Sequence, residues 1–261
     1  MFERLTSTFE REKKVLVSYM MVGYPDFETS LRAFEILIEN GSDVIEVGYP
    51  FSDPVADGST IQVAHEKALN NGIRFKDVLK AVSHLRKRYP QTPLLLMTYY
   101  NPIFKIGLEK FVSAFAEAGI DGFIVPDLPP EESADLREEA HKHNLATVML
   151  AAPTSTEKRL QLICGKTDIF TYYVSVTGIT GERDRLPLGN LKERLNLYRN
   201  VCNKKVVVGF GISKREHARE VGALADGIVV GSLFVKLAGR GDLNGLASAV
   251  RDLKEGLREA A

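Results

Sequence analysis

The chain has 261 residues, of which 44% are hydrophobic and 26% charged, which suits one large α/β barrel or two small domains. Its 34 Lys and Arg residues balance its 34 Asp and Glu residues, which argues against a generic binder of nucleic acid or membrane surfaces, because such proteins carry a basic excess. No apolar run approaches the length of a membrane span, and the charged N-terminal segment lacks the apolar core of a signal peptide.

Eight short apolar runs, rich in β-branched residues, recur along the chain and predict strands. In chain order they are Val15–Met21, Asp43–Val47, Pro93–Thr98, Gly122–Val125, Ala146–Leu150, Ile169–Val174, Lys205–Val208 and Gly227–Val230. The runs are continuously apolar rather than alternating, which is typical of a parallel sheet buried on both faces.

Longer stretches with a helical period separate these runs. They are Phe27–Glu39, Thr60–Leu69, Phe75–Arg88, Leu108–Ala118, Glu131–His143, Thr156–Cys164, Leu188–Val201, Lys214–Val221 and, last, Leu243–Leu257. Eight strand–helix units predict a single-domain (β/α)8 TIM barrel over residues 1–261, with an extra N-terminal helix. The rival architecture is an open doubly wound sheet, but no G-x-G-x-x-G opens a helix after the first strand.

The two cysteines, Cys164 and Cys202, form no C-x-x-C pair and lie in separate predicted helical regions. We therefore expect two reduced thiols in a cytoplasmic protein, rather than a disulfide or a catalytic thiol. The five histidines all lie in predicted helices, and His141 and His143 are too close in sequence to share a helix face. Surface histidines are thus expected, and no metal site is predicted.

Glu46 is the first candidate for catalysis, because it is an acid inside an otherwise apolar strand. In a βα-barrel the active site lies at the carboxyl ends of the strands. Burial there would raise the pKa of the Glu46 carboxyl and let it exchange a proton near neutral pH. The alternatives are an outward-facing glutamate or one held in a structural salt bridge.

A loop with two prolines and two aspartates, Pro50–Gly58, follows this strand. Such residues favour turns, so a simple turn is one explanation. The other is that an aspartate of the loop faces the same cavity as Glu46. Two carboxylates in different surroundings can then divide acid and base roles.

Glycines follow the last three predicted strands, and they suggest a phosphate site. The segments are Thr177–Gly181, Gly209–Gly211 and Gly231–Ser232, the last of which could open a short helix. Barrels commonly bind phosphate with the loops after strands 7 and 8 and the N-terminus of a short helix. No strand end offers a lysine, so a Schiff-base aldolase is not expected.

The stretch Ile45–Gly58 closely resembles the signature of the tryptophan synthase α subunit family, and the likeness extends along essentially the whole chain. Further segments similar to that family's strand ends, in the same order, are Met97–Pro102, Val125–Pro129, Ser175–Gly181, Val208–Ile212 and Val230–Ser232. The resemblance implies a carbon–carbon lyase that cleaves indole-3-glycerol phosphate to indole and glyceraldehyde 3-phosphate.

Site residues follow from the same resemblance. It implies that Glu46 and Asp57 are catalytic, that Tyr172 lies beside the substrate, and that Thr180 helps to position Asp57 when the loop from Thr177 to about Pro187 closes as a lid. The implied phosphate ligands are Gly181, Gly211, Gly231 and Ser232. The implied lining of the indole pocket is Tyr19, Ile61, Met97, Tyr99, Ile124 and Phe210.

The resemblance also implies a partner. The family works as an α2β2 complex with a β subunit that carries pyridoxal phosphate, and no cofactor is expected on this chain. Asp53, Asn101 and Pro102 match segments that face the β subunit. The sequence departs from the family at Ser59, where proline is frequent, and at Tyr19, where phenylalanine is common.

Three alternatives stay open at this stage. The chain could be a stand-alone indole-releasing lyase, another phosphate-binding barrel enzyme such as an isomerase or decarboxylase, or a catalytically idle subunit. The pair of Glu46 and Asp57 argues against the idle subunit, because such a barrel has no need of a buried acid.

Overall fold

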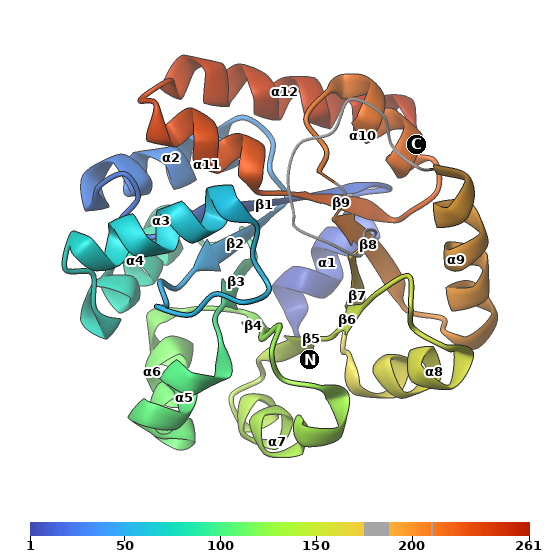
Figure 1. Ribbon diagram of the computed structural model, residues 1–261, viewed down its shortest axis with the longest axis horizontal. Helices are drawn as coiled ribbons and strands as arrows, with labels where there is room; N and C mark the ends of the chain where they lie inside the picture. The colour runs from blue at the N-terminus through green and yellow to red at the C-terminus, as the bar shows by residue number, and fades with distance from the viewer. Residues whose placement is uncertain (175–187, 210) are drawn as a thin grey trace.

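The computed structural model describes residues 1–174, 188–209 and 211–261 and contains one parallel β-barrel ringed by helices (Figure 1). The strands are β1 (Val15–Met21), β2 (Val44–Gly48), β3 (Leu94–Met97), β4 (Gly122–Ile124), β5 (Ala146–Val148), β6 (Leu150–Ala151), β7 (Phe170–Val174), β8 (Lys205–Gly209) and β9 (Gly227–Val230). Their order around the sheet is β5-β4-β3-β2-β1-β9-β8-β7-β6.

The fifth predicted strand is split in two, and this split closes the barrel. Met149 separates β5 from β6, and these two short strands stand at opposite ends of the strand order. One segment of chain therefore borders β4 on one side and β7 on the other. The backbone N–H of Tyr172 donates to the carbonyl of Met149 at 3.0 Å, which bridges the gap. The predicted eight-unit TIM barrel is confirmed.

Helices cover the outside of the barrel. They are α1 (Glu3–Arg11), α2 (Phe27–Glu39), α3 (Ser59–Asn70), α4 (Phe75–Arg88), α5 (Tyr100–Ile106), α6 (Leu108–Ala118), α7 (Ala134–Lys142), α8 (Glu157–Lys166), α9 (Leu188–Val201), α10 (Arg215–Gly222), α11 (Ser232–Gly239) and α12 (Leu243–Glu259). A short 3-10 turn, η1 (Pro130–Glu132), precedes α7 where one continuous helix was expected. The helix α5 was not predicted. No helix in the described ranges is long and apolar enough to cross a bilayer.

Strand residues alternate between two cores, as the pleat of a strand requires. One cluster fills the barrel interior and includes Val17, Val44 and Leu95. The other lies between the barrel and the helices and includes Ile45 and Leu96. The predicted N-terminal helix is confirmed as α1, whose Leu5 and Phe9 join the interior cluster and close the amino end of the barrel.

Four aspartates, each placed just before a strand, repeat one arrangement at the amino end of the barrel. Each one donates its N–H to the carbonyl of a residue in an earlier strand, which is β1, β3, β5 or β8, and its side chain accepts the N–H of that same residue. The pairs are Asp43 with Leu16, Asp121 with Leu94, Asp168 with Thr147, and Asp226 with Val206. Each carboxylate also has a cationic or imidazole partner, such as Lys254 at 2.6 Å from Asp43.

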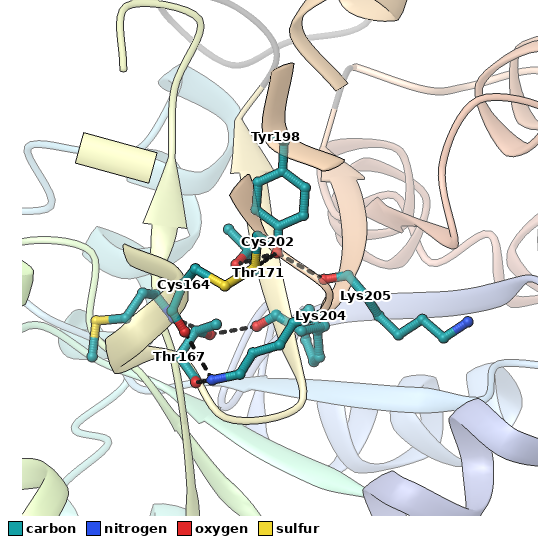
Figure 2. Close-up of a disulfide and its surroundings, with 9 residues drawn as sticks. Cys164, Thr167, Thr171, Tyr198, Cys202, Lys204 and Lys205 are labelled. Atoms are coloured by element: carbon teal, nitrogen blue, oxygen red, sulfur yellow. Dashed lines mark hydrogen bonds between the residues drawn. A yellow bond between two sulfur atoms is a disulfide. The ribbon is translucent and has the colours of Figure 1, made fainter. Parts of the chain in front are cut away.

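The expectation of two free thiols is wrong, because Cys164 and Cys202 form a disulfide (Figure 2). Cys164 lies in the last turn of α8 and Cys202 directly follows α9, with the two Cα atoms 5.7 Å apart. The helices are neighbours on the outside of the barrel (Figure 1). The two helices end next to each other only in the folded barrel. The sequence separation of 38 residues between the cysteines therefore did not indicate that they pair.

The disulfide lies beside a network of hydrogen bonds that reaches Thr171 of β7 (Figure 2). The hydroxyl of Tyr198 donates to Thr171 Oγ1 at 2.9 Å. Lys204 Nζ donates to the carbonyl oxygens of Cys164, at 2.8 Å, and Thr167. The bridge and these bonds tie α8 and α9 to the strand that carries Tyr172.

Candidate active site

Glu46 lies in the middle of β2 with its side chain inside the barrel. Val44 belongs to the interior cluster, whereas Ile45 and Val47 pack under the helices, so Glu46 shares the inward face of Val44. Glu46 is 1% exposed. Among the described residues neither of its carboxyl oxygens has a hydrogen-bond or ion-pair partner. An outward-facing glutamate is therefore wrong, and no described residue forms a salt bridge with Glu46.

The environment of Glu46 favours a neutral carboxyl near neutral pH. Burial raises the pKa of Glu46 to about 8, and the negative charge of Asp57 adds to the shift in the same direction. A buried acid without partners is costly to fold. Such a group, with a pKa near the working pH, is typical of a catalytic acid or base.

Asp57 lies in the loop between β2 and α3, and its side chain is 9% exposed. Its Oδ2 accepts two hydrogen bonds, from Tyr99 Oη at 2.7 Å and from His65 Nε2 at 3.2 Å. Tyr99 lies between β3 and α5, directly before the first residue of α5, and His65 lies in α3. The loop of Asp57 is thus more than a turn, because side chains from two other elements hold its carboxylate in place.

His65 was missed as a site residue, and the expectation that the histidines lie on the surface is wrong for two of them. His65 is 3% exposed and His217 is 5% exposed. His65 follows Ile61 by one helical turn, so both side chains lie on the buried face of α3. That spacing was the available signal in the sequence. Among the described residues, no group of three or more side chains could hold a metal ion.

Two predicted tyrosines, one on the strand next to β2 and one across the barrel, occupy inward positions as Glu46 does. Tyr19 pairs in register with Glu46 across β1 and β2 and is 5% exposed. Tyr172 occupies an inward position on β7, two residues after Phe170 of the interior cluster. Burial first, and then the negative charges of Glu46 and Asp57, raise the pKa of Tyr172 well above its usual value. Tyr172 is therefore a neutral hydroxyl that faces the barrel interior.

Two glycines leave room for these tyrosine hydroxyls. A β-carbon at Gly48 would lie 2.5 Å from Tyr19 Oη, and one at Gly209 would lie 2.9 Å from Tyr172 Oη. Both distances are shorter than side-chain contacts allow. Gly48 was not among the predicted site residues, and only the clearance around Tyr19 reveals its role.

The predicted apolar lining gathers at the same end of the barrel. Met97 and Ile124 are the last residues of β3 and β4. They are register partners in the sheet, so they lie side by side. Ile61 lies one turn before His65 on α3 and is 5% exposed. Tyr99 is almost fully buried, and its ring stacks on that of Phe51 at a centroid distance of 5.2 Å.

The predicted phosphate ligands are described only in part. Gly211, shortly after β8, has a φ of +64°, a conformation that favours glycine. Gly231 directly follows β9, and Ser232 is the first residue of α11, so the short helix expected there is present. The free N–H groups of a helix's first turn suit an anion. Thr180, Gly181 and Phe210, and the segment 177–187 expected to form a lid, lie outside the described residues.

The residues predicted to face a partner lie on one exposed edge. Asp53 and Asn101 are exposed, and Pro102 is partly buried in the first turn of α5. Two apolar side chains beside them were not predicted: Val55 is 80% exposed and Phe104 is 74% exposed. The Ala56 N–H donates to Tyr99 Oη at 3.0 Å, which ties the loop of Asp53 to the start of α5.

Comparisons with known proteins show the family of the chain. The family model for the tryptophan synthase alpha chain matches residues 5–260. A tryptophan synthase alpha chain from Aquifex aeolicus is 60% identical, with 98% of each chain covered. Another from Dehalococcoides mccartyi is 43% identical, covering 97% of this chain and 99% of the relative. A solved structure of Mycobacterium tuberculosis tryptophan synthase superposes with a TM-score of 0.91 at 35% identity, with 98% of each chain covered.

A family match over nearly the full length, a close relative and a shared barrel all point the same way. These comparisons exclude the alternative that the chain is an isomerase or decarboxylase of another barrel family. The chain therefore belongs to the tryptophan synthase alpha chain family, whose lyase reaction releases indole from indole-3-glycerol phosphate.

Proposed function

We propose that Glu46 and Asp57 perform the lyase reaction, with Glu46 as the proton carrier and Asp57 as the stabiliser of charge. The observation that carries this proposal is a buried carboxyl that has no hydrogen-bond partner among the described residues, placed near a second carboxylate that is held by hydrogen bonds. Two carboxyl groups in such different surroundings can take different roles in one reaction.

The cleavage needs a proton on C3 of the indole ring and the loss of a proton from the neighbouring hydroxyl of the side chain. Neutral Glu46 gives its proton to C3, and the resulting carboxylate then takes the hydroxyl proton. The C–C bond breaks, its electron pair restores the aromatic ring, and the hydroxyl carbon becomes the aldehyde of glyceraldehyde 3-phosphate. Glu46 ends the cycle protonated, as it began.

Asp57 accepts the N–H of the indole ring and stabilises the positive charge that forms when C3 is protonated. The apolar side chains Ile61, Met97 and Ile124 hold the ring, while Tyr172 lies beside the reacting atoms. Gly211, Gly231 and Ser232 bind the phosphate, together with Gly181. Binding energy from the phosphate end thereby positions the reacting carbon. These groups supply every step, so we propose no cofactor on this chain.

Replacement of Asp57 by Asn tests this division of roles. The variant is expected to lose about tenfold to hundredfold in kcat, because a charge-assisted contact to the ring nitrogen is lost. It should also move the pH profile. The active form carries protonated Glu46, so wild-type kcat/KM falls as the pH rises through about 8. Without the negative charge of Asp57, the pKa of Glu46 drops and this fall begins at lower pH.

The measurement is indole release over a range of pH for the wild type and the variant. Burial remains the larger cause of the raised pKa, so the inflection should stay above the ordinary value for glutamate. An unchanged inflection in the Asn variant would show that Asp57 does not act on Glu46.

We also propose that the edge formed by Asp53, Val55, Asn101, Pro102 and Phe104 binds a β subunit that carries pyridoxal phosphate, within an α2β2 complex. Two largely exposed apolar side chains on one edge of the barrel support a protein interface there. The opposing possibility is a lyase that acts alone.

Val55→Asp and Phe104→Asp are expected to weaken binding of a tryptophan synthase β subunit at least tenfold, because each one places a charge in a desolvated contact. Sedimentation of mixtures would measure the affinity. The control is Leu69→Asp, since Leu69 is 37% exposed at the far end of α3 and should leave binding unchanged. A wild-type chain that binds no β subunit would favour the stand-alone lyase.

A further inference from the structure

We infer that His65 is a positioning residue for Asp57: as a neutral donor it anchors one carboxylate oxygen and leaves the other to accept the indole N–H. This inference rests on the proposed role of Asp57 and deepens it. It concerns a helix residue that is not among the implied catalytic or binding residues.

The hydrogen bonds of His65 fix its tautomer. The backbone N–H of Phe51 donates to His65 Nδ1 at 2.9 Å. A ring nitrogen that accepts a hydrogen bond carries no proton, so the proton of the neutral ring sits on Nε2. Nε2 then donates to Asp57 Oδ2 at 3.2 Å. His65 is 3% exposed, so water does not compete for these bonds.

Both donors to Asp57 converge on the same oxygen. Tyr99 Oη donates to Oδ2 at 2.7 Å, beside His65 Nε2. Oδ1 accepts no hydrogen bond from any described residue. A carboxylate held through one oxygen keeps its orientation while the other oxygen can receive a substrate donor.

The same two side chains also hold the loop backbone. His65 accepts the N–H of Phe51 near the start of the loop, and Tyr99 Oη accepts the N–H of Ala56, directly before Asp57. Each side chain therefore bonds to both the loop and the carboxylate. The position of Asp57 is set at two points by groups outside its own segment.

The charge of the anchors matters for the chemistry. His65 and Tyr99 are both neutral donors, so they orient the carboxylate without cancelling its negative charge. A lysine or arginine in their place would neutralise the charge that is needed beside an indole ring that becomes positive. Two neutral donors in a water-poor site give the stabiliser its position in advance of the reaction.

A double-mutant cycle tests the inference in the full-length chain. His65→Leu is expected to lower kcat about tenfold to hundredfold, with KM changed by less than about threefold, because ground-state binding does not depend on the charge of Asp57 as strongly as the transition state does. In an Asp57→Asn background the same replacement should lower kcat by less than about threefold, since the group it acts through is already lost.

Two further variants separate positioning from loss of stability. His65→Gln keeps a donor for Asp57 and should recover most of the lost kcat. His141→Leu is the matched control, because His141 Nε2 also donates to an aspartate, Asp168 at 3.0 Å, but at the opposite end of the barrel. This control should lower the thermal midpoint and leave kcat unchanged.

The outcomes are distinct. An equal loss of kcat from His65→Leu in both backgrounds, or a wild-type kcat in His65→Leu, overturns the inference. A fully active Asp57→Asn variant overturns the proposed role of Asp57 instead. Nitrogen-15 NMR of labelled histidine gives a check without any variant: the inference requires the proton of His65 on Nε2, and a proton on Nδ1 contradicts it.

Discussion

Glu46→Gln is expected to bind substrate normally and to lose roughly 10²–10⁴-fold in turnover. Glutamine has nearly the same shape as a neutral glutamic acid and fills the same space inside the barrel. It cannot give up a proton, however, so neither protonation of C3 nor deprotonation of the hydroxyl can proceed through it. The loss should therefore appear in kcat, while the dissociation constant of the substrate stays close to that of the wild type.

The measurement combines substrate binding with indole release under single-turnover conditions. The chain contains no tryptophan, so the fluorescence of indole can be followed against a low protein background. Glu46→Asp is a useful companion, because it retains a carboxyl group but moves it back by one methylene. It should keep a raised pKa yet react slowly, since the distance to the reacting carbon increases. Normal indole production by Glu46→Gln would contradict the proposed mechanism.

Loss of the disulfide is the second large effect that we expect. A Cys164→Ser, Cys202→Ser double variant should lose roughly 4 kcal/mol of unfolding free energy, because the bridge closes a loop across a sequence separation of 38 in the unfolded chain. The loop contains β7 and α9, so the whole segment that delivers Tyr172 gains freedom when the bridge is absent. Activity at moderate temperature should change little, since neither sulfur touches the site.

Urea unfolding of the wild type with and without reductant, beside the serine variant, provides the measurement. Reductant should lower the midpoint of the wild type and leave the variant unaffected. A thiol titration of the denatured wild type should find no free thiol before reduction. Free thiols in the folded protein, or equal midpoints, would contradict the prediction.

The sequence predicted the barrel because its strands are buried on both sides and therefore appear as continuous apolar runs. It predicted Glu46 for the same reason, since one acid within such a run has to be buried, paired or reactive. It did not predict α5, because Pro102 resembles a loop residue although proline is tolerated in the first turn of a helix. It also did not predict that the fifth strand is interrupted at Met149, because this interruption depends on how the barrel closes.

The remaining features depend on contacts between distant segments. Cys164 and Cys202 meet only because α8 and α9 end at the same level of the barrel. The carboxylate of Asp57 is held by Tyr99, which lies between β3 and α5, and by His65 of α3. Of these contacts, the sequence indicated only the helical spacing of His65 from Ile61. Contacts of this kind depend on the tertiary structure, whereas the burial of a strand can be predicted from the local pattern of hydrophobic residues in the sequence.

The four aspartates at the amino end of the barrel join its strands two by two, β1 with β2, β3 with β4, β5 with β7, and β8 with β9. None of the four aspartates links a strand of one pair to a strand of another pair. The amino end of the barrel thus repeats one two-strand unit four times, and a single carboxylate fastens each unit. We therefore expect the chain to tolerate circular permutation or recombination best where a cut falls between two such units, because no aspartate link is broken there.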